Sequence, residues 1–407
     1  MRAPEAASAP PMTSDGSTSD VPTVKLSRKG AERLAGGHPW VYRSDIDAPK
    51  SLGPGVVRLV DGRGWFVGTA LYGQRSTIAI RLLTREDEAI DRAFWKRRLE
   101  RAIALRETLF PGEGAVRLVH AEADLLPGLV VDRYADCLVM QTPIEATDAL
   151  RGTFAELLVE LVKPRAIVER NDMKVRAHEG LPSRREVVYG SLVDPNVEFV
   201  EGGVRMTADL VEGQKTGAFL DQRENRIAAG LYARGRALDC FAYNGAFALQ
   251  LAKKAEHVTA IEISDKAAET IRANARLNGA ANVEVVCANV FDFLHAKAEG
   301  GTRYDTIVLD PPAFAKKRED LTPALRGYKE VNLRALQLLA PGGVLITASC
   351  SFHVSEAAFE EVLHAAAKDA GRSVQVVERR RAGRDHPTLL GMPESGYLKC
   401  YVLRVPD

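Results

Sequence analysis

Residues 237–264, ALDCFAYNGAFALQLAKKAEHVTAIEIS, contain an apolar run, an amphipathic stretch and a second apolar run. The two apolar runs have the length and composition of buried strands, and the stretch between them places apolar residues at helical spacing. A strand, a helix and a second strand in this order are typical of a parallel sheet, because the helix returns the chain across one face. This stretch therefore predicts the start of an α/β domain.

The same alternation continues toward the C-terminus. We expect further strands at 283–288, 304–310 and 343–349, and helices at 265–279, 290–298, 328–340 and 356–371. Two last apolar runs, 373–380 and 397–405, have no helix between them, so one of them is expected to be antiparallel. The pattern predicts a Rossmann-like sheet with a terminal hairpin.

The preceding part of the chain has a different pattern. Residues 1–22 are rich in Ala, Pro, Ser, Thr and Asp and predict a disordered tail. Residues 23–90 alternate short β-like runs with turn residues and predict a small β domain. Residues 91–203 begin with a bridging helix and mix strands with a second helix, which predicts a small α+β domain. The α/β domain occupies 204–407.

Composition excludes several classes of protein. No apolar run of the 407 residues approaches the roughly 18 needed to cross a bilayer, which argues against a membrane protein. The five cysteines are widely spaced and contain no C-x-x-C pair, which argues against a disulfide framework and a zinc site and favours a reducing cytoplasm. We therefore expect no metal.

The formal net charge of the chain is only +1, so any contact with a polyanion is expected to be local. Three basic clusters could touch a polyanion, although solvated charged faces are the simpler interpretation. They are Lys96, Arg97, Arg98 and Arg101; Lys316, Lys317 and Arg318; and Arg379, Arg380 and Arg381.

A ligand of such a sheet binds at the carboxyl ends of the strands. The first strand-to-helix turn has Gly245 as its only glycine, so it is no dinucleotide fingerprint but permits S-adenosylmethionine (SAM), which has no phosphate to cradle. Glu262 lies 23 residues after Asp239, near the spacing of a ribose-binding acid. The alternative is that Glu262 caps the next helix, which Ser264 or Asp265 can do better.

Other polar strand ends complete the expected cofactor site. Asn289 is placed to meet the adenine edge, and Asp239 to hold the methionine amino group. The cofactor-binding candidates from this edge are Asp239, Phe241, Tyr243, Gly245, Glu262, Ile263, Asn289, Val290 and Asp310.

Two further strand ends predict a methyl-acceptor site. The fourth strand ends in Asp310, Pro311 and Pro312, with Phe314 close behind, and the fifth ends in Cys350. Carbon-5 of cytosine is a poor nucleophile, so its methylation requires a thiolate to add at carbon-6 and an acid to stabilise the charge on the ring. We therefore expect Cys350 to be the nucleophile and Asp310 the group that holds the base.

The other cysteines are expected to be structural. A lone cysteine is usually a small buried hydrophobe. Cys240 lies inside a strand, and Cys137, Cys287 and Cys400 lie in apolar strand patterns, so all four are expected in the core.

The motifs GQKTGAFLDQREN, LDCFAYNGAFALQLA, IEISDKAAETIRANARLNG, DPPAFAKK, SCS and GRDHPTLLGMPESGYLK resemble the bacterial class I SAM-dependent methyltransferases that form 5-methylcytosine in large-subunit ribosomal RNA. The resemblance covers nearly everything beyond Val24. It implies an N-terminal PUA domain, which is an RNA-binding module, a small central α+β domain and a Rossmann-like methyltransferase domain. It also implies a cytoplasmic enzyme with ribosomal RNA as its partner, and a homodimer as the family expectation.

The resemblance assigns further residues. It implies that Phe219 and Asp221 help to enclose SAM, and that Gln214, Lys215, Thr216 and Arg223 belong to a segment lying over the cofactor and substrate. The expected substrate-binding residues are Gln214, Lys215, Arg223, Pro311, Pro312 and Phe314. The family usually has Asp where this chain has Asn289, which implies weaker but retained adenine binding. Asp385 and His386 either border the substrate pocket or form structural hydrogen bonds.

Three rival interpretations stay open. A D-P-P-aromatic turn also serves methylation of an exocyclic base nitrogen, in which no thiol is needed. A non-catalytic RNA-binding or ribosome-assembly protein could keep the sheet as a scaffold. A small-molecule methyltransferase would leave the PUA-like domain without a purpose.

Overall fold

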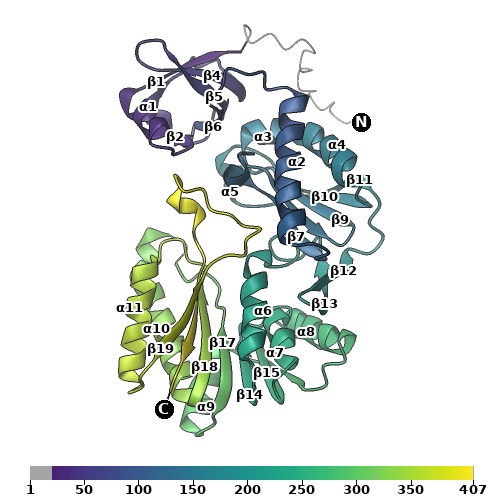
Figure 1. Ribbon diagram of the computed structural model, residues 1–407, viewed down its shortest axis with the longest axis vertical. Helices are drawn as coiled ribbons and strands as arrows, with labels where there is room; N and C mark the ends of the chain where they lie inside the picture. The colour runs from purple at the N-terminus through teal and green to yellow at the C-terminus, as the bar shows by residue number, and fades with distance from the viewer. Residues whose placement is uncertain (1–20, 316, 407) are drawn as a thin grey trace, which may run out of the picture.

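The computed structural model describes residues 21–315 and 317–406; the predicted disordered tail falls almost wholly on residues 1–20, outside the described ones. Figure 1 shows the β sheets following one another along the longest axis, from the N-terminal sheet to the C-terminal one. Within the described residues, no helix has the length and apolar character to span a membrane, and no three His, Cys, Asp or Glu side chains are grouped to hold a metal ion.

The N-terminal unit is a six-stranded sheet in the order β2-β6-β5-β4-β1-β3, as the alternating runs predict. Its strands are β1 (Thr23–Leu26), β2 (Trp40–Val41), β3 (Ile46–Asp47), β4 (Gly55–Val60), β5 (Phe66–Tyr72) and β6 (Ile80–Thr84), with helix α1 (Arg28–Ala35). Ser27 caps α1 by accepting a hydrogen bond from the Gly30 N–H.

Helix α2 (Arg92–Leu109) leads into the central unit, and Asp91 caps its N-terminus. The five strands of this unit pair in the order β11-β10-β9-β8-β7. They are β7 (Ala115–His120), β8 (Val130–Tyr134), β9 (Cys137–Gln141), β10 (Ala166–Asn171) and β11 (Arg184–Gly190), with helices α3 (Glu145–Ala149), α4 (Arg151–Val162) and α5 (Val175–His178).

A hairpin joins the central unit to the C-terminal one. Strands β12 (Asn196–Glu201) and β13 (Val204–Asp209) pair with each other across Gly202 and Gly203. Their apolar side chains share one core with residues of the central sheet and of helices in the C-terminal unit. The predicted division between residues 203 and 204 would therefore cut through the turn of a hairpin that packs against both the central and the C-terminal unit.

The C-terminal unit is a seven-stranded sheet in the order β16-β15-β14-β17-β18-β20-β19. Its strands are β14 (Arg236–Cys240), β15 (His257–Glu262), β16 (Val283–Cys287), β17 (Tyr304–Leu309), β18 (Leu339–Ser349), β19 (Gln375–Arg380) and β20 (Lys399–Arg404). Strand β20 pairs antiparallel with both β18 and β19, whereas the other pairs are parallel, which confirms the Rossmann-like sheet with a terminal hairpin.

Helices cover both faces of this sheet. One face packs on α6 (Arg223–Tyr232), α7 (Ala246–Ala252) and α8 (Asp265–Leu277), and the other on α9 (Val290–Glu299), α10 (Leu321–Leu338) and α11 (Glu356–Asp369). Helix α10 begins seven residues before the predicted start at 328.

The core prediction is wrong for Cys287, which is exposed, whereas Cys137, Cys240 and Cys400 are buried. Cys287 lies on β16, and β16 is the edge strand of the sheet. An apolar run on an edge strand keeps one side open to water, which the local pattern does not reveal.

Candidate functional site

The carboxyl ends of β14, β15, β17 and β18 form one edge, because these strands are parallel and neighbouring. Polar side chains from this edge meet the segment 214–223, which connects β13 to α6. Two groups of residues result, one around Asp239 and Glu262 and one around Asp310 and Cys350.

Backbone strain marks the first group. Phe241 and Tyr243, in the turn after β14, have φ of 64° and 51°, and Lys215 has φ of 53°. Non-glycine residues in this left-handed region cost on the order of 1–3 kcal/mol each and gather at functional sites. Gly245 follows with φ of 82°, and a Cβ there would lie 2.8 Å from Ile271 Cγ2, so glycine is required at this position.

Asp239 is a buried acid with an unused oxygen. Its Oδ2 accepts a hydrogen bond from the Ala248 N–H at 2.8 Å, and its Oδ1 is buried without a partner. Burial, with the nearby charges of Asp310 and Glu262, raises the pKa of Asp239 well above its usual range. A ligand ammonium group would supply the missing donor and counter-charge.

Glu262 holds the turn and the start of the next helix. Its two oxygens accept from the N–H groups of Tyr243 at 2.8 Å and Ser264 at 3.0 Å. Ser264 caps α8 by accepting from the Ala267 N–H, so Glu262 is not needed for that role. The carboxylate is half-buried at the edge and keeps lone pairs for a diol.

The remaining predicted cofactor residues lie around this turn. Asn289 is exposed and caps α9, its Oδ1 accepting from the Phe291 N–H at 2.9 Å. Ile263 is 67% exposed, whereas Val290 is buried. The ring of Phe219 meets that of Tyr243 edge to face, with centroids 5.2 Å apart.

Hydrogen bonds to Asp221 connect the 214–223 segment to Tyr397, which lies just before β20. Lys215 Nζ and the Tyr397 hydroxyl both donate to Asp221 Oδ2, at 2.8 and 2.6 Å. Burial alone would raise the pKa of Asp221, but the charges of Lys215 and His386 and these two hydrogen bonds outweigh it and lower the pKa. Asp221 Oδ1 is buried without a partner, so this acid too can accept from a ligand.

Asp310 and Cys350 end adjacent strands, as predicted. Asp310 Oδ1 accepts from Gln222 Nε2 at 2.7 Å. Burial, and second the negative charge of Asp221, raises the pKa of Asp310 to about 6. Cys350 is partly exposed, and its thiol contacts the Pro311 carbonyl at 3.9 Å. Burial and the neighbouring Asp310 raise the pKa of Cys350 to about 11.

Phe314 lies in an aromatic cluster and not free in the cleft. Its ring centroid is 4.6 Å from that of Tyr328 and 6.0 Å from that of Phe291. Pro312 is exposed, and Pro311 is buried beside Cys350. Gln214 is exposed, and its N–H donates to the Tyr243 hydroxyl at 3.2 Å.

The structure does not support a substrate contact for Arg223. Its side chain is 1% exposed and donates to the Ala115 carbonyl at 2.8 Å. It stacks over the Phe110 ring at 3.8 Å and pairs with Asp385. Thr216 is likewise buried and donates to Asp132 of β8 at 2.6 Å. Both residues anchor the C-terminal unit to the central one.

Asp385 and His386 form structural hydrogen bonds. Asp385 is fully buried, accepts from the Arg117 N–H at 3.0 Å and from His386 Nδ1 at 2.9 Å, and pairs with Arg223. Its carbonyl accepts from Arg106 Nη2 at 2.9 Å. The segment therefore ties the last loop to the central unit, which settles the open alternative toward a structural role.

Replacing Asp385 by Asn is expected to lower the free energy of unfolding by about 3 kcal/mol, because it leaves the buried Arg223 without its counter-charge. The pKa of Asp385 is lowered to about 2: burial opposes this, but His386 and Arg223 outweigh it. A carboxyl whose folded pKa is below its unfolded value of about 3.9 stabilises above that pH and loses its effect as pH falls toward 2.

Denaturant titrations between pH 2 and 7 measure both effects. Asp194→Asn, in an exposed loop, is the matched control and should change stability little. Equal stability of Asp385→Asn and the control would show that the network contributes nothing.

Each basic cluster has acidic partners. In the cluster at 316–318, Lys317 pairs with Glu319, and Lys316 lies outside the described residues. Lys96 and Arg97 pair with Glu160 and Glu88. In the cluster at 379–381, the partners are Glu360, Glu378 and Glu356.

Sequence reasoning missed Gln222, Tyr397 and Lys399. Lys399 is 6% exposed and donates to the carbonyls of Ser351, Val354 and Tyr397 at 2.7, 2.7 and 2.8 Å. All three residues lie in the motifs GQKTGAFLDQREN and GYLK that carry the resemblance, so membership of these motifs was the available signal.

Comparison with known proteins agrees with this geometry. Residues 24–85 match the family described as PUA-like domain, and residues 118–404 match the family of S-adenosylmethionine-dependent methyltransferases. Proteins named ribosomal RNA large subunit methyltransferase I from Shewanella amazonensis and Vibrio cholerae are 39% and 37% identical, each alignment covering 94% of this chain and 99% of the relative.

Solved structures show the same fold. A putative SAM-dependent methyltransferase from Streptococcus mutans superposes with a TM-score of 0.80 at 19% identity, covering 95% of this chain and all of that one. A putative methyltransferase crystallised with S-adenosylhomocysteine gives a TM-score of 0.81 with the same coverage.

Proposed function

The chain belongs to the family of SAM-dependent methyltransferases whose curated members are named ribosomal RNA large subunit methyltransferase I, and we propose that it methylates carbon-5 of a cytosine in large-subunit ribosomal RNA. The observation that carries the carbon-5 assignment is the pairing of Cys350 and Asp310 on neighbouring strand ends. An N-methylating enzyme needs no thiol there.

The residues at the edge fit SAM. Asp239 offers an unpartnered carboxylate oxygen to the amino group, and Glu262 offers lone pairs to the ribose hydroxyls. When bound, SAM supplies an electrophilic methyl group. Phe241, Tyr243 and Gly245 hold the backbone of the turn in the unusual conformation that brings it to the edge.

The acceptor side uses Cys350 and Asp310. The Cys350 thiolate adds to carbon-6 of the cytosine, and the Asp310 carboxyl gives its proton to the ring nitrogen while accepting from the exocyclic amine. Carbon-5 becomes nucleophilic and can accept the methyl group that bound SAM would supply. The carbon-5 proton then passes to solvent as the Cys350 thiolate is expelled, and the ring-nitrogen proton returns to Asp310, which restores the ring and the enzyme.

One observation favours this chemistry over exocyclic-nitrogen methylation, which needs no thiol. Cys350 is partly exposed at the strand end, unlike the buried Cys240 and Cys400.

Further parts of the proposal concern place and assembly. We propose that the PUA-like unit binds ribosomal RNA, that the enzyme acts in the cytoplasm, and that it forms a homodimer. Light scattering of the purified protein at several concentrations tests the last point.

Incubation of the protein with SAM and unmodified ribosomal RNA, followed by nucleoside mass spectrometry, tests the reaction. We expect 5-methylcytidine. A methylated exocyclic amine would replace the proposal with the nitrogen chemistry.

Glu262→Ala is expected to raise the dissociation constant of SAM by about tenfold or more, because two charge-assisted hydrogen bonds to the ribose would be lost. Calorimetric titration with SAM measures it. Glu269→Ala, an exposed acid on the neighbouring α8 that pairs with Arg272, is the matched control and should bind SAM normally. Equal affinities would remove Glu262 from the cofactor site.

A further inference from the structure

An exposed aromatic ring lies directly beyond the proposed nucleophile. Phe352 is two residues after Cys350, in the loop that joins β18 to α11, and 53% of its surface is exposed. Its own neighbour His353 contacts one edge of the ring, with centroids 5.3 Å apart. Covering this ring with a ligand would be favourable, because it removes apolar surface from water.

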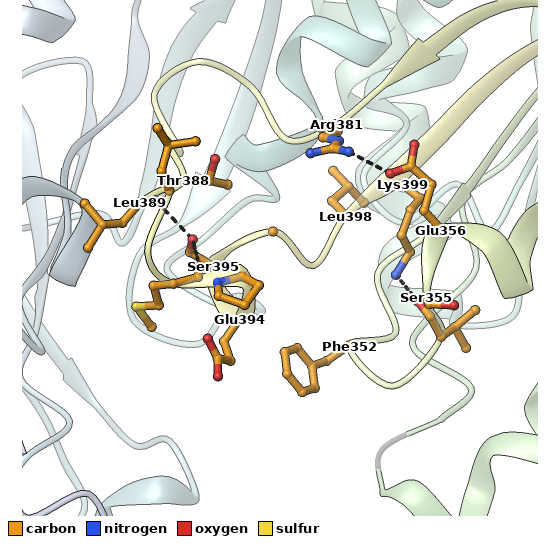
Figure 2. Close-up of a pocket in the computed structure, with 15 residues that line it drawn as sticks. Phe352, Ser355, Glu356, Arg381, Thr388, Leu389, Glu394, Ser395, Leu398 and Lys399 are labelled. Atoms are coloured by element: carbon orange, nitrogen blue, oxygen red, sulfur yellow. Dashed lines mark hydrogen bonds and ion pairs between the residues drawn. The ribbon is translucent and has the colours of Figure 1, made fainter. Parts of the chain in front are cut away.

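Phe352 lines a pocket of about 530 Å³, which is in the size range of small-ligand sites. Figure 2 shows Phe352 on one side of this space and Glu394 on the other. The first wall is the loop after Cys350 with the start of α11, and the second wall is the loop 388–396 that precedes β20.

The first wall is fixed by Lys399. Its ammonium donates to the carbonyls of Ser351 and Val354 at 2.7 Å each, so the residues on both sides of Phe352 are held by one buried cation. The ring therefore projects from a braced loop next to the nucleophile.

The second wall is joined to the N-terminal unit. Glu394 lies 3.3 Å from His38 Nε2. Gly391 packs so closely on Gly37 that a Cβ at residue 391 would lie 2.3 Å from the Gly37 carbonyl oxygen. Figure 1 shows the loop before β20 extending from the last sheet toward the N-terminal one. The pocket thus lies between the PUA-like unit and Cys350.

We propose that this pocket binds an unpaired nucleotide of the RNA next to the target cytosine, with its base stacked on Phe352; this rests on the proposed function. Proteins that read single-stranded RNA splay bases out and stack them on aromatic side chains. Arg381 lies exposed on the pocket wall and pairs with Glu356 at 2.6 Å; a backbone phosphate can take the place of that carboxylate on the guanidinium. Glu394 provides an acceptor for an exocyclic amine.

Phe352→Leu and Phe352→Trp test the proposal with full-length protein and a ribosomal RNA fragment that contains the methylated cytosine. Leucine keeps an apolar side chain without a stacking face, so we expect the RNA KM to rise about tenfold with unchanged SAM affinity. Tryptophan should keep the wild-type KM, and its fluorescence should be quenched by RNA. Tyr189→Leu, an exposed aromatic on β11, is the matched control and should leave KM unchanged.

A fragment with an abasic site beside the target identifies the stacked base. The abasic site should raise the KM of the wild type but add little to that of Phe352→Leu. An unchanged RNA KM in Phe352→Leu, or no quenching in Phe352→Trp, would overturn the pocket assignment while 5-methylcytidine formation continued. Absence of 5-methylcytidine from the wild type would instead overturn the proposed function on which the assignment rests.

Discussion

Cys350→Ala is expected to abolish 5-methylcytidine formation, with turnover falling on the order of 10⁴-fold or more, as when another covalent nucleophile is removed. No other cysteine can substitute. Cys240 and Cys400 are buried in the same sheet, Cys137 is buried in the central sheet, and Cys287 lies on β16, an edge strand. Nucleoside mass spectrometry of the RNA product measures the loss.

The control for this variant must keep the cofactor site intact. SAM affinity should be unchanged in Cys350→Ala, because none of the predicted cofactor contacts lies on β18 or in the loop after it. Cys287→Ala, which removes an exposed thiol at the carboxyl end of β16, should retain full activity. RNA containing 5-fluorocytidine should trap a covalent complex with the wild type only, since fluorine cannot leave carbon-5 as a proton does. Near-normal turnover by Cys350→Ala would exclude the carbon-5 mechanism.

The fold of the C-terminal unit could be predicted because its signal is local. Each strand is an apolar run and each helix an amphipathic one, so their succession along the chain and an antiparallel strand among the last two follow from spacing alone. The burial of a residue, by contrast, depends on contacts with segments that are distant in sequence. Cys287 sits in an apolar run like that of its neighbours, yet β16 is an edge strand, and only the strand order reveals it.

The candidate site likewise contains residues whose position could be predicted from the sequence and residues whose position could not. Glu262, Asp310 and Cys350 could be predicted because the carboxyl ends of neighbouring parallel strands meet at one edge. The contact of Tyr397 with Asp221 could not, since 176 positions separate them and only the folded chain brings them together. Arg223 misled the prediction for a related reason: an arginine is normally exposed, and its buried partner Asp385 is distant in sequence.

Asp310→Asn is expected to lower kcat on the order of 10²-fold near neutral pH, because the amide cannot give a proton to the cytosine ring. The RNA KM should change little, since an amide also presents one donor and one acceptor to the same edge of the base. Asp305→Asn, at the opposite end of β17, is the matched control and should be fully active.

The pH dependence separates proton donation from simple binding. The reactive form, a Cys350 thiolate with a protonated Asp310, carries the same number of protons as the thiol with a carboxylate. With pKa values of about 11 for Cys350 and about 6 for Asp310, its fraction is constant between these values, so kcat/KM of the wild type should be flat there and fall below about pH 6. In Asp310→Asn only the thiolate matters, so kcat/KM should rise about tenfold per pH unit across the same range. A wild-type kcat/KM that rises with pH in the same way as that of the variant would show that Asp310 binds the base without supplying a proton.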